Sequence, residues 1–290
     1  MKDPETFMKK LEHLSVLTIS GDDANEFLQG QMTQSTDALY DKKIHLTSFC
    51  NPQGRVIATA LIQLWNESYY LIVSSDLIDD LSNHLSRYIL RSKVIIRKSE
   101  LNVFGIHKKD ASEIDEADNQ SLRSLANDDE RFVLLSNEYE GRNSIVKKDW
   151  ILKDIKSGIP IIHKVNSLEY IPQMLNLDHL EGINFSKGCY TGQEVIARVQ
   201  HRGKIKQRLY RIKAKTDMVF APKDKIEHLG KKVGNVLISS LTDNTTGGTN
   251  SAFGNQTLFK NTTGDRNTAI GHQSLFQNTE GSHNTAVGYN

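Results

Sequence analysis

The sequence predicts an α+β fold for residues 1–238, followed by a repeat segment over residues 239–290. Three observations support this organisation. Short apolar runs typical of strands are interspersed with stretches in which apolar residues recur at helical spacing. Of the 290 residues, 38% are hydrophobic and 24% are charged, which is enough apolar material for packed cores. The composition also changes abruptly near residue 239, where Asn, Thr and Gly become dominant.

Strands are expected where short apolar runs end at turn residues. In chain order these runs are 14–20, 44–50, 55–65, 69–73, 94–97, 101–106, 132–135, 207–213 and 232–239. The turn Asn51-Pro52-Gln53-Gly54 separates the second run from the third. Pro52 already holds the backbone φ that the second position of a type I turn needs, so a strand–turn–strand unit is expected here.

Helices are expected at four places. The first follows Gly21-Asp22-Asp23, and the second covers 76–90, where apolar residues recur at helical spacing. The third covers 147–157 and ends at Gly158, a residue type common just after helix ends. The fourth begins near Thr191.

The last 52 residues repeat themselves. Asn, Thr and Gly supply 25 of the 52 residues from Ser239 to Asn290. Similar copies open at Asn250, Asn267 and Asn284, which gives a 17-residue period. A short fixed period is typical of repeat arrays, whose units are stabilised by stacked neighbours.

Charge and cysteine content exclude several classes of protein. The chain has 36 basic and 35 acidic residues, so its net charge of +1 gives no overall field for nucleic acid or an anionic membrane. No apolar run approaches the roughly 20 residues of a membrane span, and the polar start does not resemble a signal peptide. Two widely spaced cysteines do not suggest a disulfide framework. These features predict a soluble cytoplasmic protein without a strong nucleic-acid signal.

The segment around Cys189 carries the clearest chemical signal. Lys187 precedes it closely, and a nearby cation favours the thiolate. Thr191 and Glu194 have the spacing of a capping box, so a helix start would bring its positive end near the thiol. Gly188 and the glycine at 192 would let a ligand approach the backbone. The alternative is a buried structural cysteine beside an ordinary capped helix.

A basic run follows this segment, formed by Arg198, His201, Arg202, Lys204, Lys206 and Arg208. It could hold the glutamate tail of a folate or an RNA phosphate. The alternative is a solvated loop, and no aromatic residue interleaves with the run. His163 and His179 lack metal-ligand spacing, so no metal site is predicted.

Residues 187–198, KGCYTGQEVIAR, resemble the signature of the YgfZ family. Several flanking motifs agree with this resemblance: Thr18-Ile19-Ser20-Gly21, Phe27-Leu28-Gln29-Gly30-Gln31-Met32-Thr33, Pro52-Gln53-Gly54-Arg55, Gly158-Ile159-Pro160 and Tyr170-Ile171-Pro172-Gln173. The resemblance implies an aminomethyltransferase-like folate-binding region over residues 1–200 and part of a C-terminal β-barrel over residues 201–238.

The resemblance also implies a function. Family members bind folate, support iron–sulfur cluster synthesis or repair, and assist tRNA-modifying enzymes, so the expected cofactor is tetrahydrofolate or a derivative. The expected catalytic residues are Cys189 and Lys187. The expected cofactor-binding residues are Trp150, Gly188, Tyr190, Gly192, Gln193, Glu194 and Arg198. Trp150 would stack on the pterin, with a core tryptophan as the alternative. The family's second folate-contacting tryptophan falls at Leu14 in this chain.

Two other functions are compatible with parts of the sequence. A tetrahydrofolate-dependent aminomethyltransferase shares the fold but lacks the cysteine signature. Residues 239–290 resemble the repeats of surface fibres and trimeric adhesin heads, which would suit a structural fibre protein. That segment is foreign to the YgfZ family, so we expect a β-barrel interrupted near residue 238 and no catalytic residue beyond it.

Overall fold

The computed structural model describes residues 10–112, 114, 120–137, 144–212, 220–228, 231–239, 251–253, 268–270 and 283–287. The chain forms two compact units. The larger contains Met1–Ile212 and Ala221–Ile238, and the smaller contains Lys213–Phe220 and Ser239–Asn290. Each unit is described by itself.

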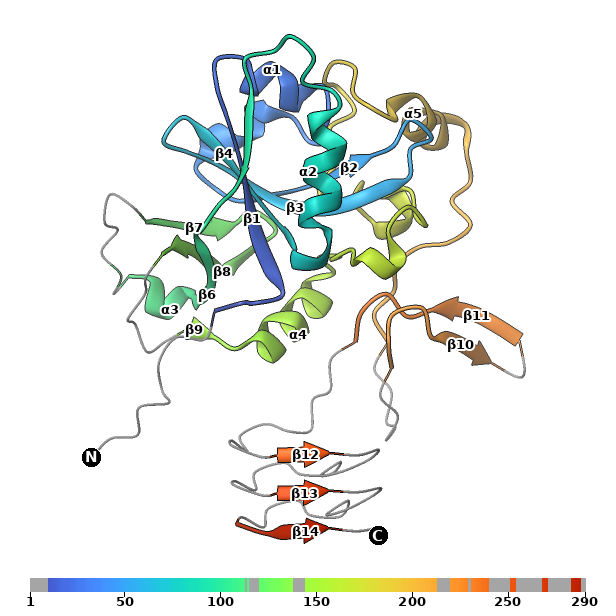
Figure 1. Cartoon of the computed structure of the whole chain (residues 1–290). Helices are drawn as coiled ribbons and strands as arrows, with labels where there is room; N and C mark the ends of the chain where they lie inside the picture. The colour runs from blue at the N-terminus through green and yellow to red at the C-terminus, as the bar shows by residue number, and fades with distance from the viewer. Residues whose placement is uncertain are drawn as a thin grey trace. The chain divides into compact units, whose positions relative to one another are not determined.

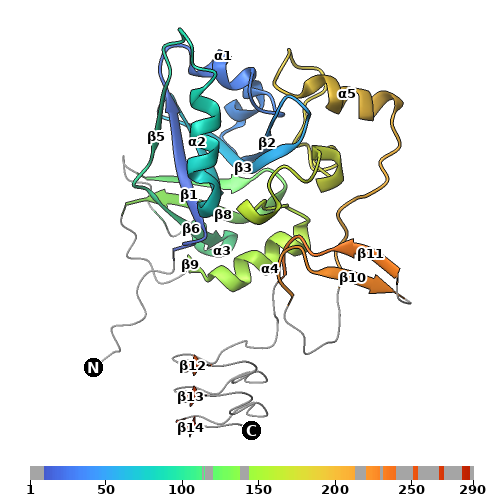
Figure 2. The same ribbon diagram turned by 45° about the vertical axis from the view of Figure 1, so that its right-hand side comes forward.

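A five-stranded antiparallel sheet forms the centre of the larger unit, with the strand order β2-β3-β4-β1-β5. Its strands are β1 (Leu14–Ser20), β2 (His45–Cys50), β3 (Val56–Trp65), β4 (Ser68–Ser74) and β5 (Ile95–Lys98). Helix α1 (Ala24–Gln29) follows β1, and α2 (Ile78–Ser86) packs on β1 and β5 (Figures 1 and 2). Leu81 and Leu85 of α2 are fully buried, as their helical spacing predicts.

A second, four-stranded sheet has the order β7-β8-β6-β9. Its strands are β6 (Asn102–His107), β7 (Ser121–Leu125), β8 (Asp128–Ser136) and β9 (Ser144–Ile145). The short helix α3 (Lys108–Ala111) follows β6, and α4 (Lys147–Ser157) follows β9. A side chain at Gly105 would place its Cβ 2.4 Å from Cε3 of Trp150, so this glycine lets α4 lie close to β6.

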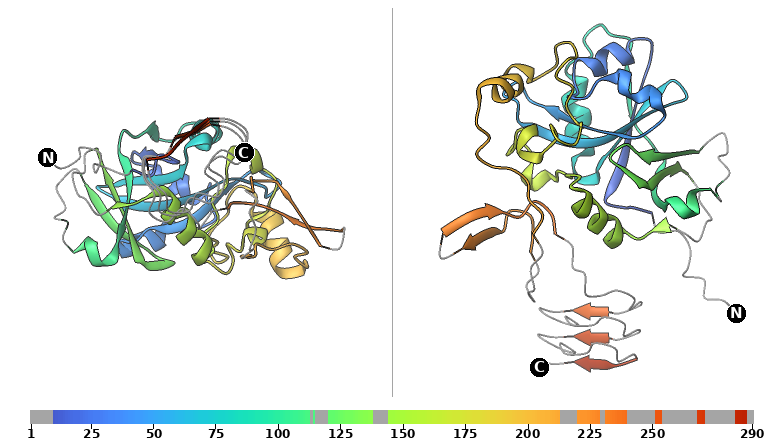
Figure 3. Two further views of the ribbon diagram at one scale, coloured as in Figure 1. Left: turned by 90° about the horizontal axis from the view of Figure 1, so that it is seen from below. Right: turned by 180° about the vertical axis from the view of Figure 1, so that it is seen from behind.

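The α+β class is confirmed, but the expected strand over 207–213 is wrong for the described residues 207–212. Arg208 is bound there by the carboxylate of Asp178, so side-chain contacts rather than backbone pairing hold the segment. The hairpin of β10 (Lys225–His228) and β11 (Lys231–Asn235) forms a separate two-stranded sheet, not a closed barrel (Figure 3).

The smaller unit contains one strand from each repeat copy: β12 (Ser251–Phe253), β13 (Thr268–Ile270) and β14 (Thr285–Val287). The three strands are parallel and pair in register, so Ala252 faces Ala269 and Ala269 faces Ala286. The 17-residue period therefore sets the step from one strand to the next. Among the described residues, no helix is long and apolar enough to cross a membrane.

A buried ion network joins β8 to α4. The guanidinium of Arg131 is completely buried; its Nε donates to Asp128 Oδ2 at 2.7 Å and its Nη1 donates to Asp154 Oδ1 at 2.6 Å. The guanidinium also lies 4.5 Å from the ring centroid of Trp150. Burial outweighs the attraction of Arg131 and raises the pKa of Asp154 to about 7.

This raised pKa predicts a pH-dependent stability. The folded state binds a proton at Asp154 more tightly than the unfolded state does. The contribution of this protonation to the free energy of unfolding is therefore fully present below pH 4 and is lost as the pH rises towards 7. Asp154→Asn should remove this dependence. The wild type should lose about 1.4 kcal/mol of its free energy of unfolding for each pH unit between pH 5 and 7, whereas the variant should not. Urea unfolding at pH 5 and pH 8 measures it. If the free energy of unfolding changes equally for the wild type and for Asp154→Asn between pH 5 and pH 8, the prediction is wrong.

Candidate functional site

Three separate stretches of the larger unit meet at the signature: residues 30–36 after α1, residues 48–55 at the end of β2 and in the turn before β3, and residues 181–198. Thr33 connects all three. Its Oγ1 donates to the carbonyl of Gly182 at 2.7 Å and accepts from the amide of Ser48 at 3.0 Å. Its own carbonyl accepts from the amide of Asn184 at 2.9 Å. Because Thr33 is fully buried, these bonds fix the approach to the signature.

The signature itself is bound to the loop after α1. The amide of Thr191 donates to the carbonyl of Gly30 at 3.1 Å, and its hydroxyl donates to Gln31 Oε1 at 3.2 Å. The side chain of Gln34 donates to the carbonyl of Glu181. Although the two motifs were both visible in the sequence, nothing there indicated that they contact each other.

Gly192 is the residue at which the signature lies closest to the turn 51–54. Its φ of 84° lies in the left-handed region, and a Cβ there would fall 2.6 Å from the carbonyl oxygen of Asn51 and 3.1 Å from Cα of Gly54. The turn 51–54 is closed by the amide of Gly54 donating to the carbonyl of Asn51 at 2.9 Å. The expected tight turn is thus present, and it packs against Gly192 of the signature.

The predicted capping box is wrong. Helix α5 (Gln193–Arg202) has Gly192 as its N-cap residue, and no side chain caps it. The left-handed backbone at Gly192 places the helix start after Thr191, whose hydroxyl bonds Gln31 instead. Glu194 forms an exposed ion pair with Arg198 at 2.6 Å. Arg198 lies on α5, so the solvated loop considered as the alternative for the basic run does not begin there.

Lys187 forms hydrogen bonds with the loop after α1. Its Nζ donates to the carbonyls of Met32 and Gln34, each at 2.8 Å, and lies 5.1 Å from the ring centroid of Tyr190. Burial lowers the pKa of Lys187 to about 8. These hydrogen bonds give the ammonium a structural role, and the expected support of the Cys189 thiolate stays a prediction.

The two cysteines have opposite environments. Cys189 is exposed, so the buried structural cysteine considered for this position is excluded. Cys50 is completely buried, and that burial raises the pKa of its thiol to about 12. Tyr190 is also buried, and its pKa is raised by burial and by the nearby Cys50. Tyr190 and Cys50 are thus buried and stay protonated near neutral pH, whereas the Cys189 thiol is accessible.

Thiol labelling should distinguish the two cysteines. A disulfide reagent such as Ellman's should modify one equivalent rapidly in the native protein and a second only after unfolding, because a thiol reacts only where the reagent can reach it. Cys189→Ala should remove the rapid equivalent, whereas Cys50→Ser should retain it. Rapid modification of two equivalents in the native protein would contradict this assignment.

Trp150 lies away from the signature. It belongs to α4, and Figures 1 and 2 show α4 and α5 at opposite ends of the larger unit. Its side chain is 0% exposed and packs against Gly105 and the guanidinium of Arg131. This environment matches a core tryptophan and leaves no surface for a pterin to stack on in this conformation. Folate contact by Trp150 stays a prediction.

The remaining residues predicted to bind a cofactor do lie together, in the 188–198 segment. Gly188, Glu194 and Arg198 are exposed, whereas Gln193 is half-buried. At the helix start, the backbone N–H of Gln193 donates to the carbonyl of Tyr190 at 3.1 Å. Among the described residues, no group of three His, Cys, Asp or Glu side chains could hold a metal ion.

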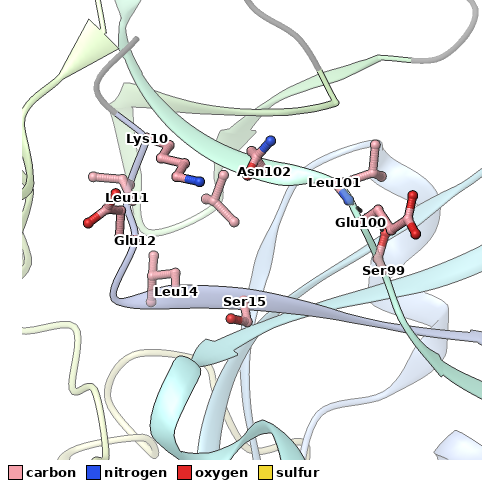
Figure 4. A pocket seen from close by; sticks show the side chains of 10 residues that line it. Lys10, Leu11, Glu12, Leu14, Ser15, Ser99, Glu100, Leu101 and Asn102 are labelled. Carbon is pink, nitrogen blue, oxygen red and sulfur yellow. Dashed lines mark hydrogen bonds between the residues drawn. The ribbon is translucent and has the colours of Figure 1, made fainter.

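A pocket of about 260 Å³ lies elsewhere, at the N-terminal end of β1 (Figure 4). It is lined by Lys10, Leu11, Glu12, Leu14, Ser15, Ser99, Glu100, Leu101, Asn102 and Val103. Leu14 is thus at a pocket, but Trp150 is not among its lining residues. Its volume lies just below the roughly 300–1,000 Å³ of typical small-molecule sites.

The larger unit has the fold of an aminomethyltransferase. It resembles the glycine cleavage system aminomethyltransferase T from Bartonella henselae with a TM-score of 0.52 and 12% identity, over 66% of this chain and 62% of that chain. The chain thus spans less than two thirds of that protein.

Curated relatives identify the family more closely. The tRNA-modifying protein YgfZ of Yersinia pestis (strain Pestoides F) is 31% identical over 266 residues, covering 81% of each chain. The protein of the same name from Hamiltonella defensa subsp. Acyrthosiphon pisum (strain 5AT) is 31% identical over 227 residues, covering 69% of this chain and 68% of its own. No protein-family model matches the chain. The chain belongs to the YgfZ family.

Proposed function

We propose that this chain supports tRNA modification through iron–sulfur cluster synthesis or repair, with Cys189 as its reactive group. The observation that carries the proposal is the exposure of Cys189 on a segment bound on both sides. Lys187 and Thr191 hold the flanking backbone to the loop after α1. Family membership supports the same function, because the relatives are named as tRNA-modifying proteins.

The chemistry available to this site is that of one accessible thiol. A thiolate can attack an electrophilic sulfur or donate to a metal. Four cysteine ligands are usual for an iron–sulfur cluster, so Cys189 alone would need the other ligands from a partner protein or a small thiol. An iron–sulfur protein or a tRNA-modifying enzyme is therefore the expected partner.

Folate is part of the proposal through the family and the fold. Gly188, Tyr190, Gln193 and the Glu194–Arg198 pair are the candidate contacts around the thiol. Because Trp150 is enclosed, the signature and the surroundings of Trp150 are two competing locations for folate. Equilibrium dialysis with tetrahydrofolate tests this part, with Trp150→Phe and Arg198→Gln as the two competing site variants.

The whole proposal is tested by rescue. In a strain lacking its own family member, this chain should restore the thiolated nucleosides of bulk tRNA. The empty vector is the control. If an expressed, folded chain restores none of these nucleosides, the proposed function is wrong.

The aminomethyltransferase-like fold favours one second candidate, a tetrahydrofolate-dependent aminomethyltransferase. Transfer of an aminomethyl group to tetrahydrofolate, measured with purified protein, distinguishes the two. The signature cysteine would be dispensable for that reaction, whereas our proposal requires it.

We also propose that the site belongs to residues 1–200 and that residues 201–238 form its partial barrel neighbour. The repeat segment 239–290 then contributes no site residue. A chain ending at 238 should keep rapid labelling of Cys189 and rescue as well as the full chain. Loss of rescue by a folded truncated chain would show that the repeats take part.

A further inference from the structure

Positive charge is concentrated just after the signature. The stretch 187–212 contains seven Lys or Arg residues and one acidic residue, Glu194, whereas the whole chain has a net charge of +1. The rest of the chain is therefore net negative. A positive region on an otherwise acidic protein attracts anions locally, even when the overall charge is near zero.

Carboxylates neutralise only part of this charge. Arg198 pairs with Glu194, and Arg208 forms two hydrogen bonds with Asp178 at 2.9 and 2.8 Å. Arg202, Lys204 and Lys206 are exposed, and none has an ion-pair partner among the described residues. Arg202 ends α5, where a cation is ordinary, but Lys204 and Lys206 lie beyond the helix and have no such structural reason.

The backbone carrying these cations is extended and fixed at its far end. Residues 203–212 run from the end of α5 without helix or strand (Figure 2). The guanidinium of Arg208 bonds Asp178, and the carbonyl of Leu209 accepts from Asn176 Nδ2 at 2.8 Å. The segment is therefore held against the body while its cations face solvent.

An exposed aromatic residue follows the cations. Tyr210 is 78% exposed, so its ring contacts little of the protein. An exposed aromatic ring on the same extended segment as unpaired cations is a combination that binds single-stranded nucleic acid, because the ring stacks on bases and the cations contact phosphates. No aromatic residue lies within the basic run 198–208 itself. Tyr210 follows the run by two residues, and the structure shows that its ring is exposed.

We propose that Arg202, Lys204, Lys206 and Tyr210 form an RNA-docking surface on the end of α5 and the segment that follows it. This inference rests on the proposed role in tRNA modification and adds a direct contact with RNA. The partner is single-stranded or looped RNA, recognised through phosphates and one stacked base. A folate glutamate tail fits less well, because the cations lie on an open, extended segment rather than at an enclosed cavity.

Fluorescence anisotropy with a 5′-labelled tRNA transcript and the full chain tests this surface. The wild type should bind at low salt, and Arg202→Gln/Lys204→Gln/Lys206→Gln should weaken binding by about two orders of magnitude at moderate salt. The slope of log K against log[salt] should become shallower by about 2 to 3, one unit or slightly less per lost phosphate contact. Tyr210→Ala should weaken binding by about tenfold without changing that slope.

A matched triple variant controls for net charge. Arg87, Arg91 and Arg97 are also exposed, lie near α2 and β5, and have no ion-pair partner among the described residues. Arg87→Gln/Arg91→Gln/Arg97→Gln removes the same charge and should bind as the wild type does. Equal losses in both triple variants, or no binding by the wild type at low salt, would overturn the proposal.

Two further measurements separate this inference from the proposed function. Cys189→Ala should bind the transcript normally, because the thiol lies outside the surface. If the 202/204/206 variant fully rescues tRNA thiolation, the docking surface is wrong while the proposed function stands. If that variant loses affinity for a polyglutamylated folate but not for RNA, the surface binds the folate tail instead.

Discussion

Replacement of Gly192 by alanine is expected to lower the free energy of unfolding by about 2–5 kcal/mol. About 1–2 kcal/mol comes from the left-handed backbone, which disfavours any Cβ. A further 1–3 kcal/mol or so comes from overpacking against the carbonyl of Asn51, 2.6 Å from the new Cβ. Since domains are stable by only about 5–15 kcal/mol, the variant should lose a large share of its stability.

Two other glycines separate these contributions. Gly158 has a φ of 75° but no atom within 4 Å of a built Cβ, so Gly158→Ala should show only the backbone cost of about 1–2 kcal/mol. Gly188 has no neighbouring atom within 4 Å and no left-handed φ, so Gly188→Ala should change stability by less than about 0.5 kcal/mol. Urea unfolding followed by circular dichroism measures all three. If Gly192→Ala is no less stable than Gly158→Ala, a Cβ at position 192 does not clash with the turn 51–54.

Replacement of Arg131 by methionine is expected to destabilise the protein by about 3–5 kcal/mol at pH 8, because it leaves Asp154 buried without its counter-ion. The loss should be smaller at pH 5, where Asp154 is protonated, since its folded pKa is about 7. Unfolding in urea at both pH values measures the difference.

Two variants control this result. Arg198→Met breaks an exposed ion pair and should cost less than about 1 kcal/mol. Arg131→Met/Asp154→Leu removes both buried charges and should recover much of the stability lost by Arg131→Met. If the double variant is less stable than Arg131→Met, the network stabilises the fold through Asp128 and Trp150 rather than through the Arg131–Asp154 pair.

Much of the fold could be predicted from local patterns. The strand over Leu14–Ser20 and the helix over Lys147–Ser157 were predicted with the bounds that the structure has. The strand Ser121–Leu125 was missed, because its polar residues and Arg123 weaken the apolar signal. The strand expected at 207–213 failed since Arg208 binds Asp178, a contact between residues far apart in sequence.

The candidate site was predictable as motifs but not as an assembly. Cys189 and its glycines were visible in the sequence, and Cys189 is indeed exposed. The capping box at Thr191 failed, because a local spacing rule cannot see the turn at Asn51 that forces Gly192 into a left-handed conformation. For the same reason the sequence could not show that Lys187 bonds the carbonyls of Met32 and Gln34.

The proposed role of Cys189 as the reactive group for tRNA modification is tested by the level of thiolated tRNA nucleosides in a strain lacking its own family member. Mass spectrometry measures these nucleosides. The strain would express the wild type, Cys189→Ala or Ser186→Ala at matched protein levels. Ser186 is exposed on the same segment, so it controls for a local change. We predict that the wild type and Ser186→Ala restore the thiolated nucleosides and that Cys189→Ala does not; full restoration by Cys189→Ala would contradict the claim.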